Sequence, residues 1–261
     1  MPNMQDAPLL RSSRGASALL CLTALLWLGL DVARAASPEW ETPPVSHKDV
    51  KPYVDVTALH ALVLPPPPEE GSQIDRDDIA GVLARQQVDA KRREMAEADG
   101  NLLYDRFAPL LGVEIRRDRF PALVNLLNRS VRQAGQPAFA AKNLYRRLRP
   151  YQRLTLTHVC GRSGGSTPDP DAQQRTSYPS GHSTYGWTTA LVLARVAPDK
   201  APALLARARE YAESRLICSM HFPSDVEAGR ALATAVVSQL DLNPEFQQDL
   251  QRARAELAAA R

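Results

Sequence analysis

Apolar positions in this chain recur mostly at helical spacing, and the alternation typical of half-buried strands is nearly absent. From Asp75 to Asp99 an apolar residue returns about every three to four positions within a charged stretch, which predicts helix up to a stop signal at Gly100. The residues that carry this repeat are Ile79, Val82, Leu83 and Val88.

A second apolar repeat predicts a helix that opens near Pro121 and ends before Gly135. It consists of Leu123, Leu126, Leu127 and Val131. We expect a separate helix from Ala138 to Leu148, because Pro150 disfavours helical backbone at Arg149. Residues 151–178, with many glycines and prolines, read as a long irregular segment, and such segments in compact domains are often functional.

The pattern returns to helices beyond that segment. One helix is expected from Ser183 to Val196, and Asp199 is a candidate cap for another that reaches Ile217. Ser224 and Glu227 have the spacing of a capping box, which predicts a helix to about Leu240. We therefore predict an all-α fold, a single compact multi-helix domain over residues 69–261 without internal repeats.

The N-terminal region has a different composition. Arg11 and Arg14 precede an apolar stretch, residues 16–30, and Ala33-Arg34-Ala35 follows as a small-x-small cleavage pattern, so residues 1–36 are interpreted as a signal peptide. The alternative is a membrane anchor, but the stretch is shorter than the roughly 20 residues that span a bilayer. Residues 37–68 end in four prolines and are expected to form a proline-rich N-terminal arm.

Charge and cysteine content narrow the possible partners and the cellular compartment of the protein. The net charge is only +3, which gives no indication of nucleic acid or of an anionic membrane as partner. Cleavage of the leader would leave two of the three cysteines, Cys160 and Cys218, in an oxidising compartment, which predicts a disulfide; the alternative is two buried thiols. No further cluster of Cys, His and carboxylate residues has metal-ligand spacing, so neither a metal nor another cofactor is expected.

Three motifs in the C-terminal half carry the candidate chemistry. They are Lys142-x(6)-Arg149-Pro150, Pro179-Ser180-Gly181-His182 and Ser214-Arg215-x(5)-His221-x(3)-Asp225. Each alone has an ordinary explanation: a solvated basic face, a helix N-cap, and a surface pair four residues apart. Together, in this order, they supply what phosphoryl transfer through a covalent intermediate requires.

Each motif has a physical interpretation. Lys142 and Arg149, seven residues apart, would project from one helix face, and the glycine turn at Gly181 would aim free backbone N–H groups at an anion. Ser180 adds a hydroxyl donor and Arg215 a bidentate fork for phosphate oxygens. His182 is placed as a general acid, and Asp225 could accept the Nδ1–H of His221, leaving Nε2 free as a nucleophile.

These motifs resemble the signature of the type 2 phosphatidic acid phosphatase and vanadium haloperoxidase superfamily. Residues 64–72 and 214–230 are in addition similar to the class A bacterial non-specific acid phosphatases of the periplasm. The resemblance implies a helical fold, metal-independent hydrolysis and a phosphohistidine. It assigns His221 as nucleophile, His182 as acid and Asp225 as the residue that orients His221. The phosphate ligands it implies are Lys142, Arg149, Ser180, Gly181 and Arg215.

The chain departs from the family pattern at Asp75, where an aromatic residue is usual, at Ser183, and at Phe222-Pro223 beside the nucleophile. The resemblance implies a periplasmic enzyme acting on small phosphomonoesters, without a membrane anchor in its mature form. It leaves open a homo-oligomer and phosphotransfer to alcohols. The alternatives are a vanadium-dependent haloperoxidase, which shares the pocket, and a non-enzymatic secreted helical binding protein, which would need a degenerate site. Hydropathy excludes an integral lipid phosphatase.

Overall fold

The computed structural model describes residues 50–260, and within them the regular structure is helical. The only β-type pairing in this part of the chain is an isolated antiparallel bridge between Leu156 and Ser166. The prediction of an all-α fold is therefore confirmed. The predicted signal peptide, residues 1–36, and residues 37–49 of the predicted arm lie outside the described residues.

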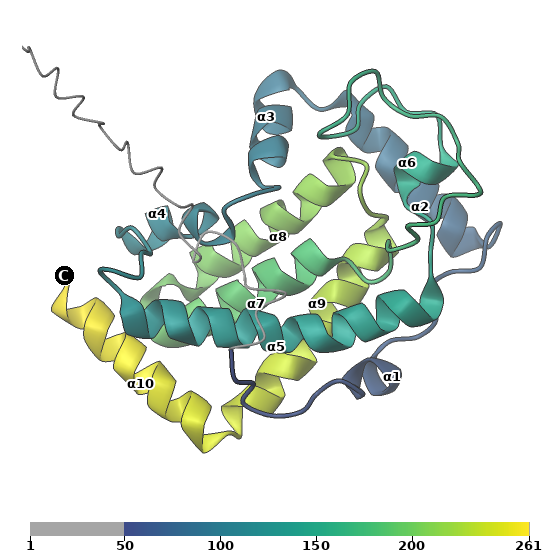
Figure 1. The fold of residues 1–261 in the computed structure, drawn as a ribbon. Helices are drawn as coiled ribbons and strands as arrows, with labels where there is room; N and C mark the ends of the chain where they lie inside the picture. The colour runs from purple at the N-terminus through teal and green to yellow at the C-terminus, as the bar shows by residue number, and fades with distance from the viewer. Residues whose placement is uncertain (1–49, 261) are drawn as a thin grey trace, which may run out of the picture. The chain divides into compact units, whose positions relative to one another are not determined.

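Figure 1 gives the order of the elements along the chain. The α-helices are α1 (Leu59–Val63), α2 (Gln73–Ala84), α3 (Ala90–Ala98), α4 (Ala108–Leu111), α5 (Pro121–Tyr145), α6 (Pro150–Arg153), α7 (Gly181–Val196), α8 (Ala201–Ile217), α9 (Pro223–Asp241) and α10 (Pro244–Ala259). Short 3₁₀ turns, η1 (Arg85–Gln87), η2 (Leu103–Arg106) and η3 (Pro198–Lys200), join some of them.

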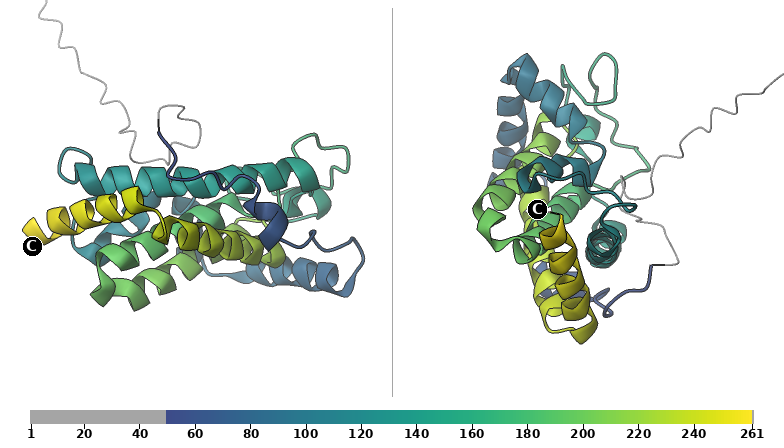
Figure 2. Two further views of the ribbon diagram at one scale, coloured as in Figure 1. Left: turned by 90° about the horizontal axis from the view of Figure 1, so that it is seen from below. Right: turned by 90° about the vertical axis from the view of Figure 1, so that its left-hand side faces the viewer.

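Helix α7 is the centre of the helical core. It packs against α5, α8 and α9, and α10 packs against α5 (Figures 1 and 2). The close packing of α7 on α8 requires a glycine at position 186. A Cβ on Gly186 would come within 2.5 Å of the Tyr211 ring. The buried side chains that fill this core include Leu123, Leu127, Leu193, Leu204 and Val236. This arrangement places the N-terminus of α7 beside the turn that joins α8 to α9.

The helix predicted over Asp75 to Asp99 is two helices. Helix α2 ends at Ala84, and α3 begins after Asp89, whose carboxylate accepts a hydrogen bond from the Arg92 amide at 2.8 Å. Asp89 is thus an N-cap inside what looks like one apolar repeat. The sequence interpretation missed it because Val88 continues the helical spacing although its backbone is extended.

The predicted break at Gly135 is also wrong, because α5 runs without interruption through Gly135 and Pro137. A proline inside a helix costs about 3 kcal/mol, and burial of a long apolar face against the core outweighs this. Gly135 has a packing role instead, since a Cβ there would lie 3.2 Å from the Tyr185 hydroxyl oxygen. The helix ends at Tyr145, earlier than predicted, because Arg146 adopts a left-handed conformation with φ of 48°.

The N-terminal caps of α8 and α9 differ from those predicted. Asp199 lies in η3, and Lys200 precedes α8, whose end at Ile217 agrees with the prediction. Helix α9 is capped by Asp225, which accepts a hydrogen bond from the Phe222 amide at 2.8 Å, so the capping box proposed for Ser224 and Glu227 is wrong. Helices α1, α4, α6 and α10 were not predicted from the apolar pattern. None of the helices in residues 50–260 is both long and apolar enough to cross a bilayer.

Candidate active site

The second and third motifs are joined directly. Ser180 is the N-cap residue of α7, its side chain accepts a hydrogen bond from the Ser183 amide, and its own amide donates to the Asp225 carbonyl at 2.8 Å. Gly229 permits this contact, because a Cβ there would lie 2.6 Å from the Ser180 carbonyl oxygen. The N-terminus of α7, where Ser180 and Gly181 offer donors for an anion, therefore lies against the first turn of α9.

His221 is held between a carboxylate and a cation. Its side chain is buried, with Nδ1 3.6 Å from Asp225 Oδ2 and Nε2 3.3 Å from Arg149 Nη1. Because a guanidinium can only donate, Nε2 acts as the acceptor and the ring proton belongs on Nδ1, facing Asp225. Burial and the nearby Arg149 lower the pKa of His221 well below its usual value. The ring is therefore neutral, with the Nε2 lone pair directed toward the cations.

Asp225 is fully buried and saturated with donors. Its Oδ2 accepts hydrogen bonds from Ser177 Oγ at 2.6 Å and from the Phe222 amide, and its Oδ1 accepts one from Arg147 Nη1 at 2.7 Å. Burial favours the neutral acid, but His221, Arg147 and Ser177 outweigh it and hold the pKa of Asp225 below its usual range. The carboxylate beside His221 is consequently an anion in a fixed orientation.

Lys142 and Arg149 do meet, although not from one helix face as predicted. Lys142 belongs to the last turn of α5, whereas Arg149 lies in extended backbone just before α6. The side chains converge on Thr176: Lys142 Nζ donates to its carbonyl at 2.5 Å, and Arg149 Nη2 to its hydroxyl at 3.1 Å. Burial, followed by repulsion from Arg149, lowers the pKa of Lys142 to about 7.

His182 faces the segment that follows α3, and Arg215 faces the last turn of α3 itself. His182 Nε2 lies 3.3 Å from the Gly100 carbonyl oxygen, and Arg215 Nη2 donates to the Ala96 carbonyl at 2.7 Å. The His182 ring also stacks on Tyr211, with centroids 6.1 Å apart. Burial, followed by the charge of Arg215, lowers the pKa of His182 to about 3 in the ligand-free protein. A bound phosphate dianion would act in the opposite direction, because a nearby anion favours the imidazolium.

Sequence reasoning missed the residues that support this set. Arg147, which lies between Lys142 and Arg149, was given no role from the sequence, yet it is buried and bonded to Asp225. Ser177 and Thr176, in the irregular segment, provide a donor to Asp225 and an acceptor for Arg149. No local pattern distinguishes these residues. The one sequence signal for Thr176 and Ser177 was their place in the irregular segment, residues 151–178, between the first and second motifs.

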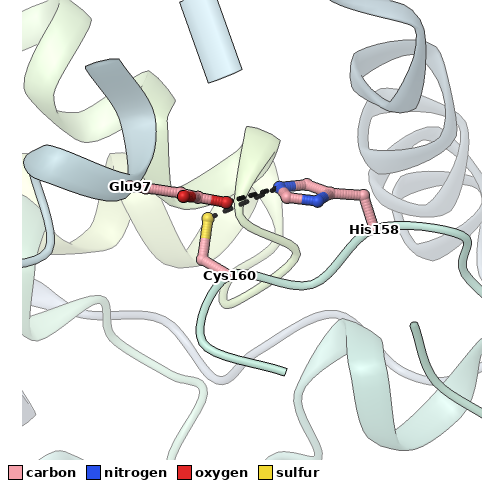
Figure 3. A group of neighbouring side chains, drawn as sticks. All are labelled: Glu97, His158 and Cys160. Atoms are coloured by element: carbon pink, nitrogen blue, oxygen red, sulfur yellow. Dashed lines mark hydrogen bonds and ion pairs between the residues drawn. The ribbon is translucent and has the colours of Figure 1, made fainter. Parts of the chain in front are cut away.

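The predicted disulfide between Cys160 and Cys218 is present. Cys160 also belongs to a group of potential metal ligands that contains Glu97 and His158. The ligand atoms of these three residues are all within 4.8 Å of one another (Figure 3). Because the Cys160 sulfur is bonded to Cys218, it is not available as the thiolate that metals bind. This group therefore provides only one histidine and one exposed carboxylate.

The disulfide connects the irregular segment to the turn between Arg215 and His221. Loss of the bridge in a Cys160→Ser variant is expected to lower the free energy of unfolding by about 4 kcal/mol, because the bridge closes a long loop in the unfolded chain. Denaturant titration of both proteins checks this. The bridge itself is tested by alkylation of the denatured wild-type protein without reductant; labelling of Cys160 and Cys218 would refute it.

Comparisons with known proteins identify the family of the chain. Residues 123–240 match the family model of the PAP2 superfamily. The non-specific acid phosphatase of Providencia stuartii is 37% identical over 83% of this chain and 90% of its own length. The acid phosphatase of Zymomonas mobilis is 33% identical over 77% of this chain and 76% of its own length. A non-specific acid phosphatase of Salmonella typhimurium is 32% identical over 74% of this chain and 78% of its own length.

The chain therefore belongs to the PAP2 superfamily, and within it to the class A non-specific acid phosphatases. It is accordingly a phosphatase.

Proposed function

We propose that the protein is a periplasmic acid phosphatase that hydrolyses small-molecule phosphate monoesters through a phosphohistidine at His221. One observation carries this proposal: the His221 ring has Nδ1 toward the Asp225 carboxylate and Nε2 toward Arg149. An imidazole in this orientation can attack phosphorus with Nε2 while the carboxylate stabilises the positive charge that develops on the ring. Secretion rests on the leader pattern of residues 1–36.

In the first step, His221 Nε2 forms a bond to phosphorus as the ester P–O bond breaks. His182, as the imidazolium, transfers its proton to the departing oxygen, so that the product leaves as an alcohol. Lys142, Arg149 and Arg215, with the Ser180 hydroxyl and the Gly181 amide, would bind the three non-bridging oxygens. Their charges are already in place, so little reorganisation is needed as charge redistributes in the transition state.

In the second step, His182 is neutral and accepts a proton from water, whose oxygen attacks phosphorus. The P–N bond breaks, its electron pair returns to Nε2, and inorganic phosphate leaves. An alcohol in place of water would give phosphotransfer to that alcohol. The proposal therefore includes a phosphotransferase side activity that rises with alcohol concentration.

The pKa shifts support an acidic optimum. Lys142, with its pKa lowered to about 7, is charged in mild acid and loses its proton as the pH rises, which weakens phosphate binding. His182 is neutral in the free site, since its pKa is about 3, and must gain a proton. A phosphate monoester, whose second pKa is about 6, can deliver this proton below pH 6. Both effects reduce kcat/KM toward alkaline pH.

The test is turnover by the exported protein with EDTA present. We expect hydrolysis of nucleotides, sugar phosphates and aryl phosphates, with kcat/KM highest in mild acid and with competitive inhibition by vanadate and inorganic phosphate. Metal independence is expected because the cations of the site can perform the electrostatic work of a metal. An enzyme inactivated by EDTA and restored by zinc would contradict the mechanism. No turnover of any substrate would refute the function.

A further inference from the structure

Arg147 is a buried arginine that donates hydrogen bonds to two carboxylates on different elements. Its side chain is about 8% exposed. Nη1 donates to Asp225 Oδ1 at 2.7 Å, and Nη2 donates to Asp78 Oδ2 of α2 at 2.8 Å. The guanidinium also lies over the Phe222 ring, 4.4 Å from its centroid. Arg147 therefore connects α2 to the residue that faces His221.

The surroundings of Arg147 form a buried charged cluster. Asp75 lies 3.6 Å from Arg147 Nη2 and pairs with Arg153 through both of its oxygens, at 2.6 and 2.9 Å. Asp78 is fixed by the Ser224 amide at 2.8 Å, next to Asp225 in the first turn of α9. The cluster consists of Asp75, Asp78, Arg147, Arg153 and Asp225. Within it, Arg147 is the cation that Asp225 contacts directly.

We propose that Arg147 is a positioning residue for phosphoryl transfer: it fixes the Asp225 carboxylate against His221 and keeps it anionic while positive charge develops on the imidazole. This inference rests on the proposed function, because it acts through the nucleophile assigned there. Arg147 would contact neither the phosphate nor the leaving group, since its donors are directed at Asp78, Asp225 and Ser224.

Asp225 requires such a partner because it is fully buried. An isolated carboxylate in this position would take up a proton rather than remain charged. The other charged or titratable groups that interact with Asp225 are His221, Lys142, Arg149 and Tyr178. Lys142 and Arg149 are proposed phosphate ligands, so their charge is neutralised when substrate binds. Arg147 is the cation that stays with Asp225 through the whole reaction.

The test compares Arg147→Lys and Arg147→Gln with wild-type enzyme. Lysine keeps the charge but cannot hold two carboxylates in one fixed fork. We expect kcat to fall by roughly ten- to a hundred-fold in both variants, the scale on which misplaced catalytic groups slow reactions. The Ki for inorganic phosphate, a ground-state ligand, is expected to stay unchanged. Protonation of Asp225 should reduce kcat/KM at low pH, and this decline is the acidic limb of the pH profile. In Arg147→Gln the acidic limb should move to higher pH, because Asp225 loses the cation that keeps it ionised.

Arg129 provides a matched control. It is about 7% exposed, pairs with Asp249 at 2.8 Å and Glu245 at 3.0 Å, and lies over the Tyr53 ring. Arg129→Lys and Arg129→Gln should therefore lower stability as the Arg147 variants do, but leave kcat and the acidic limb unchanged. If Arg147→Gln does not fold, the kcat of Arg147→Lys and its Ki for inorganic phosphate test the proposal.

The outcomes separate the two proposals. A wild-type enzyme without a phosphohistidine would refute the proposed mechanism itself. A wild-type enzyme that forms it, together with Arg147 variants whose kcat and acidic limb match those of the Arg129 variants, would refute only the positioning role. A rise in the Ki for inorganic phosphate comparable to that in Arg149→Lys would also refute that role, because it would make Arg147 a phosphate ligand.

Discussion

Replacement of His221 by alanine is expected to abolish both turnover and the trapping of a phosphoenzyme. The loss in kcat should reach about 10⁴-fold or more, the range found when a covalent nucleophile is removed. Alanine leaves no atom that could form the bond to phosphorus, and the phosphate-binding residues alone cannot replace it. Rapid acid-free quenching with labelled substrate, followed by peptide mapping, measures the phosphoenzyme directly.

The control for this experiment is His60→Ala. The His60 ring contacts the Thr57 carbonyl at 2.8 Å, within the segment that contains α1, and it belongs to none of the three motifs. It should therefore retain both turnover and labelling. Label mapped to His182, or a phosphoenzyme that persists in His221→Ala, would show that the two histidine roles are wrongly assigned.

Replacement of His182 by alanine is expected to give a loss that depends on the leaving group. With alkyl phosphates, kcat should fall about 10²–10⁴-fold, the usual contribution of general acid catalysis. An aryl phosphate, whose leaving group scarcely needs a proton, should still phosphorylate His221. The phosphohistidine should then accumulate, because His182 is no longer present to activate water. Burst kinetics with an aryl substrate measure this accumulation.

The comparison of substrates is itself the control for folding. A misfolded His182→Ala protein would lose activity on alkyl and aryl substrates to the same degree. Equal loss of phosphoenzyme formation in His182→Ala and His221→Ala with an aryl phosphate would contradict the assignment of His182 as the acid. Tyr211→Phe removes a hydroxyl while keeping the ring that stacks on His182, so it should not show the leaving-group dependence.

The sequence predicted most of the helices because apolar spacing reports the face that a helix buries. The ends of α7 and α8 at Val196 and Ile217 agree with the structure for this reason. The pattern failed where local and tertiary effects compete. Pro137 and Gly135 suggest a break in any isolated segment, but both lie in α5, where packing against α7 keeps the helix intact. At Asp89 the reverse occurs, and a local cap divides an apolar repeat.

The site was predictable as a set of residues but not as an arrangement. The spacing of Lys142 and Arg149 suggested one helix face, whereas the left-handed Arg146 ends α5 and a different path brings Arg149 to Thr176. Arg147 and Ser177 could not be identified, because their importance comes from contact with Asp225, far away in the sequence. Burial of an arginine depends on the tertiary fold. In the sequence alone, a run of neighbouring arginines in a helical pattern indicates a solvent-exposed face.

The contact between His182 and the Gly100 carbonyl affects how the substrate preference of this enzyme could evolve. The proposed phosphate ligands and the nucleophile all come from residues 142–225, whereas the segment beside the proposed acid follows α3, in an earlier part of the chain. That segment also reaches a proposed phosphate ligand, because Asp99 accepts a hydrogen bond from the Ser214 hydroxyl at 2.6 Å and a Cβ at Gly100 would lie 3.7 Å from Arg215 Nη1. Variation in residues 99–102 would therefore alter the surroundings of His182 and of Arg215 together. A change of substrate preference that begins in this earlier stretch of the gene would thus require compensating changes in the later stretch that encodes the motifs.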